Sequence, residues 1–148
     1  MSIPPDQRGP HLAAAFLCER VLKEQDGVTS AIRIVDRLTV GAIGLDAPKE
    51  MPLAQIQLKA VVILKSGAAR GSYEVKLSIE APSGVSNDLG EYPVYFGGEE
   101  QGVELLVDLN LNLSAQGLYW IDVSFGDELL TRIPLRIVYA PSRPPRGD

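Results

Sequence analysis

The stretch from Gly117 to Tyr139 constrains the fold of this chain most, because apolar and polar residues alternate along two successive runs. The runs are separated by a turn of Gly126, Asp127 and Glu128. Successive side chains of a β-strand point to opposite faces, so the alternation assigns each residue to one face. The apolar face consists of Tyr119, Ile121, Val123, Phe125, Leu129, Thr131, Ile133, Leu135 and Ile137. The pattern predicts an antiparallel hairpin with one buried side and one side in water.

The water-facing side of this hairpin carries the main candidate site. A three-residue loop predicts three cross-strand pairs there: Leu118 with Arg136, Trp120 with Pro134, and Asp122 with Arg132. We expect Asp122 and Arg132 to form a structural ion pair. Trp and Arg are the residue types most enriched at binding hot spots. The pattern therefore indicates a partner-binding surface, the Trp120 face, made of Leu118, Trp120, Arg132, Pro134 and Arg136.

Two other interpretations of the Trp120 face stay open. A loop or the proline-rich tail could fold over Trp120, or Arg132 and Arg136 could simply stack on its ring.

The rest of the chain predicts an all-β protein. About eight strand-like runs, separated by turn residues, occupy residues 11–139 and predict one antiparallel β-sandwich domain. A chain of 148 residues that is 45% hydrophobic can bury one core without disulfides. Residues 1–10 and the Pro-rich residues 140–148 lack apolar periodicity, and we expect both to be flexible and disordered.

An earlier pair of runs, Leu12–Glu24 and Thr29–Val40, predicts a second hairpin. A loop of residues 26–28 would place Arg20 diagonal to Asp36 on the largely apolar side. A charge on such a side is tolerated only when it is paired. We therefore expect a partly buried ion pair between Arg20 and Asp36.

The run Ser114–Ile121 resembles the entry to strand F of immunoglobulin-like domains, where a conserved Tyr forms the tyrosine corner. Gly117 and Tyr119 fit this pattern, and Ile121 stands where an antibody domain has Cys. The chain departs from the pattern because no Asp precedes Gly117 at the usual place and a single Cys cannot form an intramolecular disulfide.

A second resemblance covers more of the chain. Residues 18–38, taken together with residues 117–139, resemble an uncharacterised bacterial family of small immunoglobulin-like β-sandwich proteins. The resemblance implies the fold and implies no activity.

Residues for catalysis or metal binding are scarce. His11 is the only histidine and lies near the N-terminus, so we expect a surface histidine rather than the base of a triad. Cys18 lies among apolar residues and is expected to be a buried, inert thiol. One Cys and one His cannot make a structural zinc site. A calcium loop at residues 97–102 is a weaker alternative, because acidic residues in turns are usually solvated. We expect no enzyme, no metal and no cofactor.

Charge and hydropathy narrow the possible partners and the cellular location of the protein. The net charge of −5, without a basic cluster, argues against nucleic acid. The longest apolar run, Leu12–Cys18, is too short to span a membrane, and the first residues lack the features of a secretory signal. A lone thiol is typical of a reducing compartment, so we expect a cytoplasmic protein.

The function that fits these observations is a non-enzymatic protein–protein interaction or assembly module of a bacterial cytoplasmic complex. Its partner would be another protein or a second copy of the chain, held on the Trp120 face or on an exposed edge strand. The alternative is a carbohydrate-type binding module that stacks a small ligand on Trp120.

Overall fold

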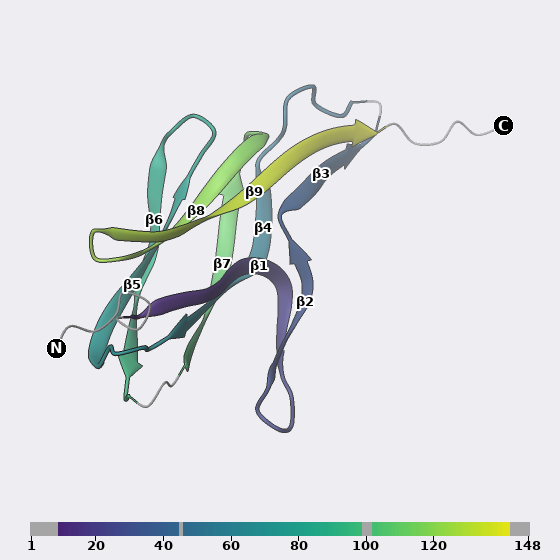
Figure 1. Cartoon of the computed structure of the whole chain (residues 1–148). Helices are drawn as coiled ribbons and strands as arrows, with labels where there is room; N and C mark the ends of the chain where they lie inside the picture. Colours follow the sequence, from purple (N-terminus) through teal and green to yellow (C-terminus); the bar gives the residue numbers. More distant parts are fainter. Residues whose placement is uncertain (1–8, 45, 99–101, 143–148) are drawn as a thin grey trace.

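The computed structural model describes residues 9–44, 46–98 and 102–142. These residues form nine strands in two packed sheets and contain no helix (Figure 1). The strands are β1 (His11–Lys23), β2 (Thr29–Val35), β3 (Arg37–Ile43), β4 (Ala54–Lys65), β5 (Gly71–Glu80), β6 (Ser86–Phe96), β7 (Gly102–Leu113), β8 (Gly117–Phe125) and β9 (Glu128–Ser142). The predicted all-β, immunoglobulin-like sandwich is confirmed.

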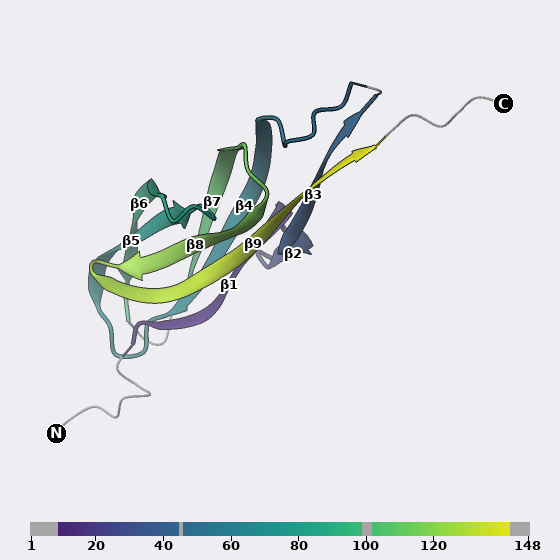
Figure 2. The ribbon, with the colours of Figure 1, turned by 90° about the horizontal axis from the view of Figure 1, so that it is seen from above.

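The two sheets divide the strands unequally. Sheet A has the order β2-β1-β4-β7, and sheet B has the order β3-β9-β8-β5-β6. All neighbouring strands are antiparallel except β3, which runs parallel to β9. Figure 2 shows β9 as a long, bowed strand that leaves its hairpin with β8 and continues beside β3. Sheet B therefore places β3, from the first third of the chain, beside the C-terminal strand β9.

The ninth strand arises because one predicted run is split between the sheets. The sequence pattern treats residues 29–40 as one strand, but the chain breaks at Asp36, leaving β2 in sheet A and β3 in sheet B. The backbone N–H of Arg136 in β9 donates a 2.8 Å hydrogen bond to the Asp36 carbonyl at this crossing. Alternation alone does not distinguish one long strand from two consecutive strands that run in the same direction. The predicted number of strands is therefore one too low.

The core follows the predicted alternation of the β8–β9 hairpin with one exception. Tyr119, Ile121 and Leu135 are each at most 3% exposed. Leu129, predicted to point inward, is instead 52% exposed. The turn has two residues rather than three, and a register shift after Val123 makes Leu130 the residue that packs against the core.

The predicted register of the first hairpin is wrong by two residues. The N–H of Glu24 donates a 2.8 Å hydrogen bond to the carbonyl of Val28, so the loop is residues 25–27 rather than 26–28. Gly27 takes the left-handed conformation, with φ of 87°, as the last loop residue. A two-residue shift preserves which face each side chain occupies but changes its partner across the strands.

This shift removes the predicted ion pair between Arg20 and Asp36. Arg20 lies opposite Ile32 and is exposed, while Asp36 is exposed at the break between β2 and β3. Within the described residues, no salt bridge joins the two.

The ends of the domain differ slightly from the expected boundaries. β9 continues to Ser142, and residues 140–142, expected in the tail, pair with the end of β3. Residues 1–8 and 143–148, for which flexibility is expected, lie outside the described residues, as do residues 99–101 of the candidate calcium loop.

Candidate interaction surface

The structure brings the Trp120 face together as predicted. In the β8–β9 register, Leu118 lies opposite Arg136 and Trp120 lies opposite Pro134. Trp120 and Leu118 are half-buried, whereas Pro134 and Arg136 are exposed. These residues therefore form a continuous surface on the outer face of sheet B, between β8 and β9.

Arg132 fixes the tryptophan ring. Its Nε donates a 2.7 Å hydrogen bond to Oδ1 of Asp122, which confirms the predicted ion pair. Its guanidinium also pairs with the carboxylate of Glu80, and its Cζ lies 4.8 Å from the ring centroid of Trp120. The hydrogen bonds to Asp122 and Glu80 raise the pKa of Arg132 above its ordinary value. Stacking by Arg132, one of the open interpretations, therefore occurs and covers one side of the ring.

Glu80 is a member of this site that sequence reasoning missed. It lies opposite Trp120 because β5 pairs with β8 in sheet B. These two strands are separated by two others along the chain, so no turn sets their register in the sequence. The only indication of this role in the sequence is Glu80 itself, a charged residue at the end of an alternating run.

A second residue outside the prediction, Arg37, extends the surface on the other side of β9. Arg37 in β3 is the register partner of Arg136, and both side chains are exposed. Among the described residues, neither forms an ion pair with a carboxylate. Adjacent like charges on a sheet are destabilising. The pair is therefore an uncompensated positive site beside Leu118.

An apolar depression adjoins the Trp120 face at Pro134. It has a volume of about 300 Å³ and lies where β1 and β2 of sheet A meet β9. Its lining is mostly apolar, with Phe16, Ile133 and the 62% exposed Ile34, and it includes the exposed Asp36. Because Pro134 belongs to both, the depression and the Trp120 face form one surface.

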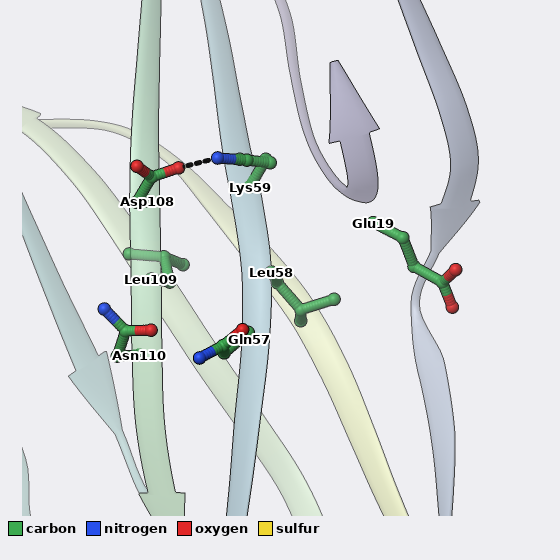
Figure 3. Close-up of a pocket in the computed structure, with 7 residues that line it drawn as sticks. All are labelled: Glu19, Gln57, Leu58, Lys59, Asp108, Leu109 and Asn110. Carbon is green, nitrogen blue, oxygen red and sulfur yellow. Dashed lines mark hydrogen bonds and ion pairs between the residues drawn. The ribbon is translucent and has the colours of Figure 1, made fainter.

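A polar depression of about 290 Å³ lies over β4 and β7 of sheet A (Figure 3). Lys59 reaches from β4 to the carboxylate of Asp108 on β7, beside Gln57 and Asn110. The lining residues include no Ser, Cys or His that could act as a nucleophile or an imidazole base. This depression is therefore a solvated ion-pair surface.

The remaining candidate groups have structural environments. Cys18 is fully buried as expected, its Sγ donates to the Arg20 carbonyl at 3.4 Å, and burial raises the pKa of the thiol. His11 is half-buried rather than on the surface. Within the described ranges, no group of three or more His, Cys, Asp or Glu side chains is placed to hold a metal ion. The same residues include no helix long and apolar enough to cross a bilayer.

The tyrosine corner is present. The hydroxyl of Tyr119 donates a 2.7 Å hydrogen bond to the carbonyl of Ala115, four residues earlier, and burial raises the pKa of Tyr119. Two packed sheets with this corner at the start of β8 define an immunoglobulin-like β-sandwich protein. Within that class, the chain belongs to the family of unknown function DUF6941, whose profile matches residues 13–138. The resemblance to an uncharacterised family is thereby confirmed.

Solved structures with a similar arrangement come from several proteins. β-Glucosidase 3B from Thermotoga neapolitana, in complex with glucose, aligns with 63% of this chain at a TM-score of 0.48 and 11% identity. β-Glucosidase from Listeria innocua, in complex with isofagomine, aligns with 87% at 0.49 and 10% identity. This chain covers only 16% of each of those chains.

A protein of more similar length is the immunoglobulin-like protein from Pseudomonas aeruginosa. It aligns with 88% of this chain and 98% of its own, at a TM-score of 0.42 and 14% identity. No curated protein matches the chain. Similarities this distant say nothing about activity.

Proposed function

We propose that this protein is a non-enzymatic interaction or assembly module of a bacterial cytoplasmic complex. It holds an acidic segment of a partner protein against the outer face of sheet B. The docking surface comprises the Trp120 face, extended by Arg37 across β9 and by the apolar depression beside Pro134.

The observation that carries the proposal is the pairing of Arg37 with Arg136. These exposed guanidinium groups are register neighbours and have no carboxylate partner among the described residues, although the whole chain carries a net charge of −5. A carboxylate from a partner would relieve their mutual repulsion and accept charge-assisted hydrogen bonds from both. The site therefore favours Asp or Glu in the partner.

The apolar surroundings favour a protein partner over a free anion. Leu118 lies opposite Arg136, and the depression beside Pro134 exposes Ile34 to solvent. An apolar side chain next to the acidic group could fill this depression and bury Ile34, which is the arrangement typical of binding hot spots. The proposed ligand is thus a segment that combines carboxylates with one apolar anchor.

The carbohydrate alternative is less well supported. A sugar stacks on an open aromatic face, but Arg132 already lies 4.8 Å from the centroid of Trp120 and is held by two carboxylates. A sugar would have to use the other side of the ring or displace this arrangement. Because Trp120 is the only tryptophan, its fluorescence reports directly on either event.

The test is affinity capture from the native host with the wild type and with the double variant Arg37→Glu/Arg136→Glu. Each captured protein is then purified, and its affinity for both forms is measured by calorimetry at low and high salt. We expect a partner with an acidic segment, salt-sensitive binding, and a loss of affinity of at least about 100-fold in the variant, because like charges would oppose each other.

A matched control carries the same change in charge elsewhere. Lys65→Glu/Arg70→Glu replaces two exposed basic residues at the connection between β4 and β5, which lines neither the Trp120 face nor the apolar depression, and it should bind the partner like the wild type. Equal binding by Arg37→Glu/Arg136→Glu and the wild type would refute the proposed surface. Quenching of Trp120 by oligosaccharides, with no protein captured, would favour the carbohydrate alternative instead.

A further inference from the structure

The outer edge of β7 is open. β7 is the last strand of sheet A and pairs only with β4. A strand at the edge of a sheet presents unpaired backbone N–H and C=O groups that can template another strand. Natural proteins protect such edges with short strands, proline, bulges or charges.

The other three edge strands carry such protection. β2 has seven residues, and Arg33 within it adopts a left-handed φ of 57°. β3 also has seven residues. β6 contains Pro93 and is interrupted by a register shift opposite Leu77 and Ser78. Each of these edges is therefore a poor template for a long added strand.

β7 differs from them in length and regularity. All of its twelve residues pair with β4 without a register shift, which makes this the longest unbroken strand pair in the described structure. Its sequence contains no proline, lysine or arginine, and its one glycine, Gly102, is the first residue. The β7 edge therefore lacks the common devices that prevent pairing.

The acidic side chains of this edge are neutralised within the chain. Asp108 pairs with Lys59, as Figure 3 shows, and Glu104 lies 3.0 Å from Nζ of Lys23. These ion pairs reduce the repulsion that two such edges would otherwise exert on each other. The half-exposed Leu106 lies on the same face of β7 as the two acidic residues.

We propose that a second copy of this chain pairs with β7 along its open edge, so that the two four-stranded sheets A form one continuous sheet across a two-fold axis. A two-fold contact requires a surface that is complementary to itself. An antiparallel register centred on Leu109 meets this requirement, because it sets Asp108 opposite Asn110 of the other copy and Leu106 opposite Asn112. A register centred on Asp108 would oppose the two carboxylates and is disfavoured.

This inference names one surface for the proposed assembly role, and it is separate from the Trp120 face. β7 belongs to sheet A and the Trp120 face belongs to sheet B. Each surface can therefore be altered without changing the other, so the two proposals can fail independently.

The test is the molar mass of the full chain, measured by analytical ultracentrifugation over a wide concentration range. The edge variant is Leu106→Glu/Asn110→Glu, which places acidic residues at four successive outward positions of β7. Every antiparallel register centred between residues 106 and 110 then opposes acid to acid. We expect the wild type to form a dimer and the variant to dissociate at least about 100-fold more readily.

The control variant, Ser72→Glu/Asn87→Glu, adds the same charge at exposed positions of sheet B and should remain dimeric. Circular dichroism checks that each variant is folded. If the edge variant does not fold, hydrogen exchange of the wild type tests the pairing instead. The β7 amides should exchange faster on dilution if the edge is paired in the dimer.

A monomeric wild type at all concentrations, a dimer that survives the edge variant, or a dimer lost equally in the control would each overturn the proposal. Loss of the dimer only in Arg37→Glu/Arg136→Glu would assign self-association to the Trp120 face.

Discussion

The hydroxyl of Tyr119 and the carbonyl of Ala115 are joined by a 2.7 Å hydrogen bond that closes the turn before β8. Tyr119 is 3% exposed, so its ring contributes to the core while its hydroxyl ties down the preceding loop. The bond is local in sequence yet links the β7–β8 connection to the core of the sandwich. The corner can therefore be recognised from a short segment of the sequence alone.

Replacing Tyr119 by Phe should remove only this bond. We expect the free energy of unfolding to fall by about 0.5 to 1.5 kcal/mol, since a partly buried hydrogen bond is lost while the ring remains. Urea unfolding followed by circular dichroism measures the change. Tyr95→Phe is the matched control, because Tyr95 is 69% exposed, and it should alter stability by less than about 0.5 kcal/mol. Equal effects of the two variants would contradict a structural role for the corner.

The two leucines after the β8–β9 turn test the register shift. Leu130 packs against the core, whereas Leu129 is 52% exposed. Leu130→Ala should cost about 1 to 2 kcal/mol, less than a fully buried leucine because Leu130 is only partly covered. Leu129→Ala should stay within about 0.5 kcal/mol of the wild type. Urea unfolding of both variants decides, and a larger loss for Leu129→Ala would favour the three-residue turn.

The sequence predicted what depends on local alternation and failed where two strands far apart had to be aligned. The alternation of side chains correctly predicts that Tyr119 faces the core and Trp120 the outer side of the sheet. The Asp122–Arg132 ion pair follows from the pairing of two strands joined by a short turn. The loop around Gly27 was framed one residue too late, which kept every face but changed the partners. The false Arg20–Asp36 pair followed directly from that error.

Only the part of the candidate site that lies on the β8–β9 hairpin can be predicted from the sequence, because the other parts depend on pairing between distant strands. Hairpin geometry relates β8 to β9, but nothing local relates β5 to β8 or β3 to β9. Glu80 and Arg37 enter the surface through those two pairings, and each changes its chemistry. Glu80 helps to hold Arg132 on the tryptophan, while Arg37 turns a single exposed arginine into a pair.

Arg132 should control the environment of the only tryptophan. Arg132→Ala removes the cation from above the Trp120 ring and releases Asp122 and Glu80 from their shared partner. We expect the emission maximum to shift to the red and acrylamide quenching to increase, because more of the ring contacts water. Arg20→Ala, a change on the other sheet, should leave both unchanged. An unaltered spectrum in Arg132→Ala would show that the stacking does not shield the ring.

The stability of the contact between the β1–β2 hairpin and β7 should depend on pH through Glu104. Hydrogen bonds from Thr29 and Lys23 lower the pKa of Glu104 in the folded protein, so the folded state binds a proton less readily than the unfolded state. The stabilisation is therefore fully present above the unfolded pKa of about 4.3 and is lost as pH falls through the lower folded value.

The variant Glu104→Gln isolates this contribution. At neutral pH we expect it to lower the free energy of unfolding by about 0.5 kcal/mol, a modest figure because the Lys23–Glu104 pair is largely exposed. The difference from the wild type should shrink as pH falls below about 4. Urea unfolding at matched ionic strength across this range measures it, with Glu50→Gln as the control, since Glu50 is exposed and forms no ion pair among the described residues. A difference that stays constant down to the lowest pH would show that the Glu104 carboxylate does not stabilise this corner of the sheet by its charge.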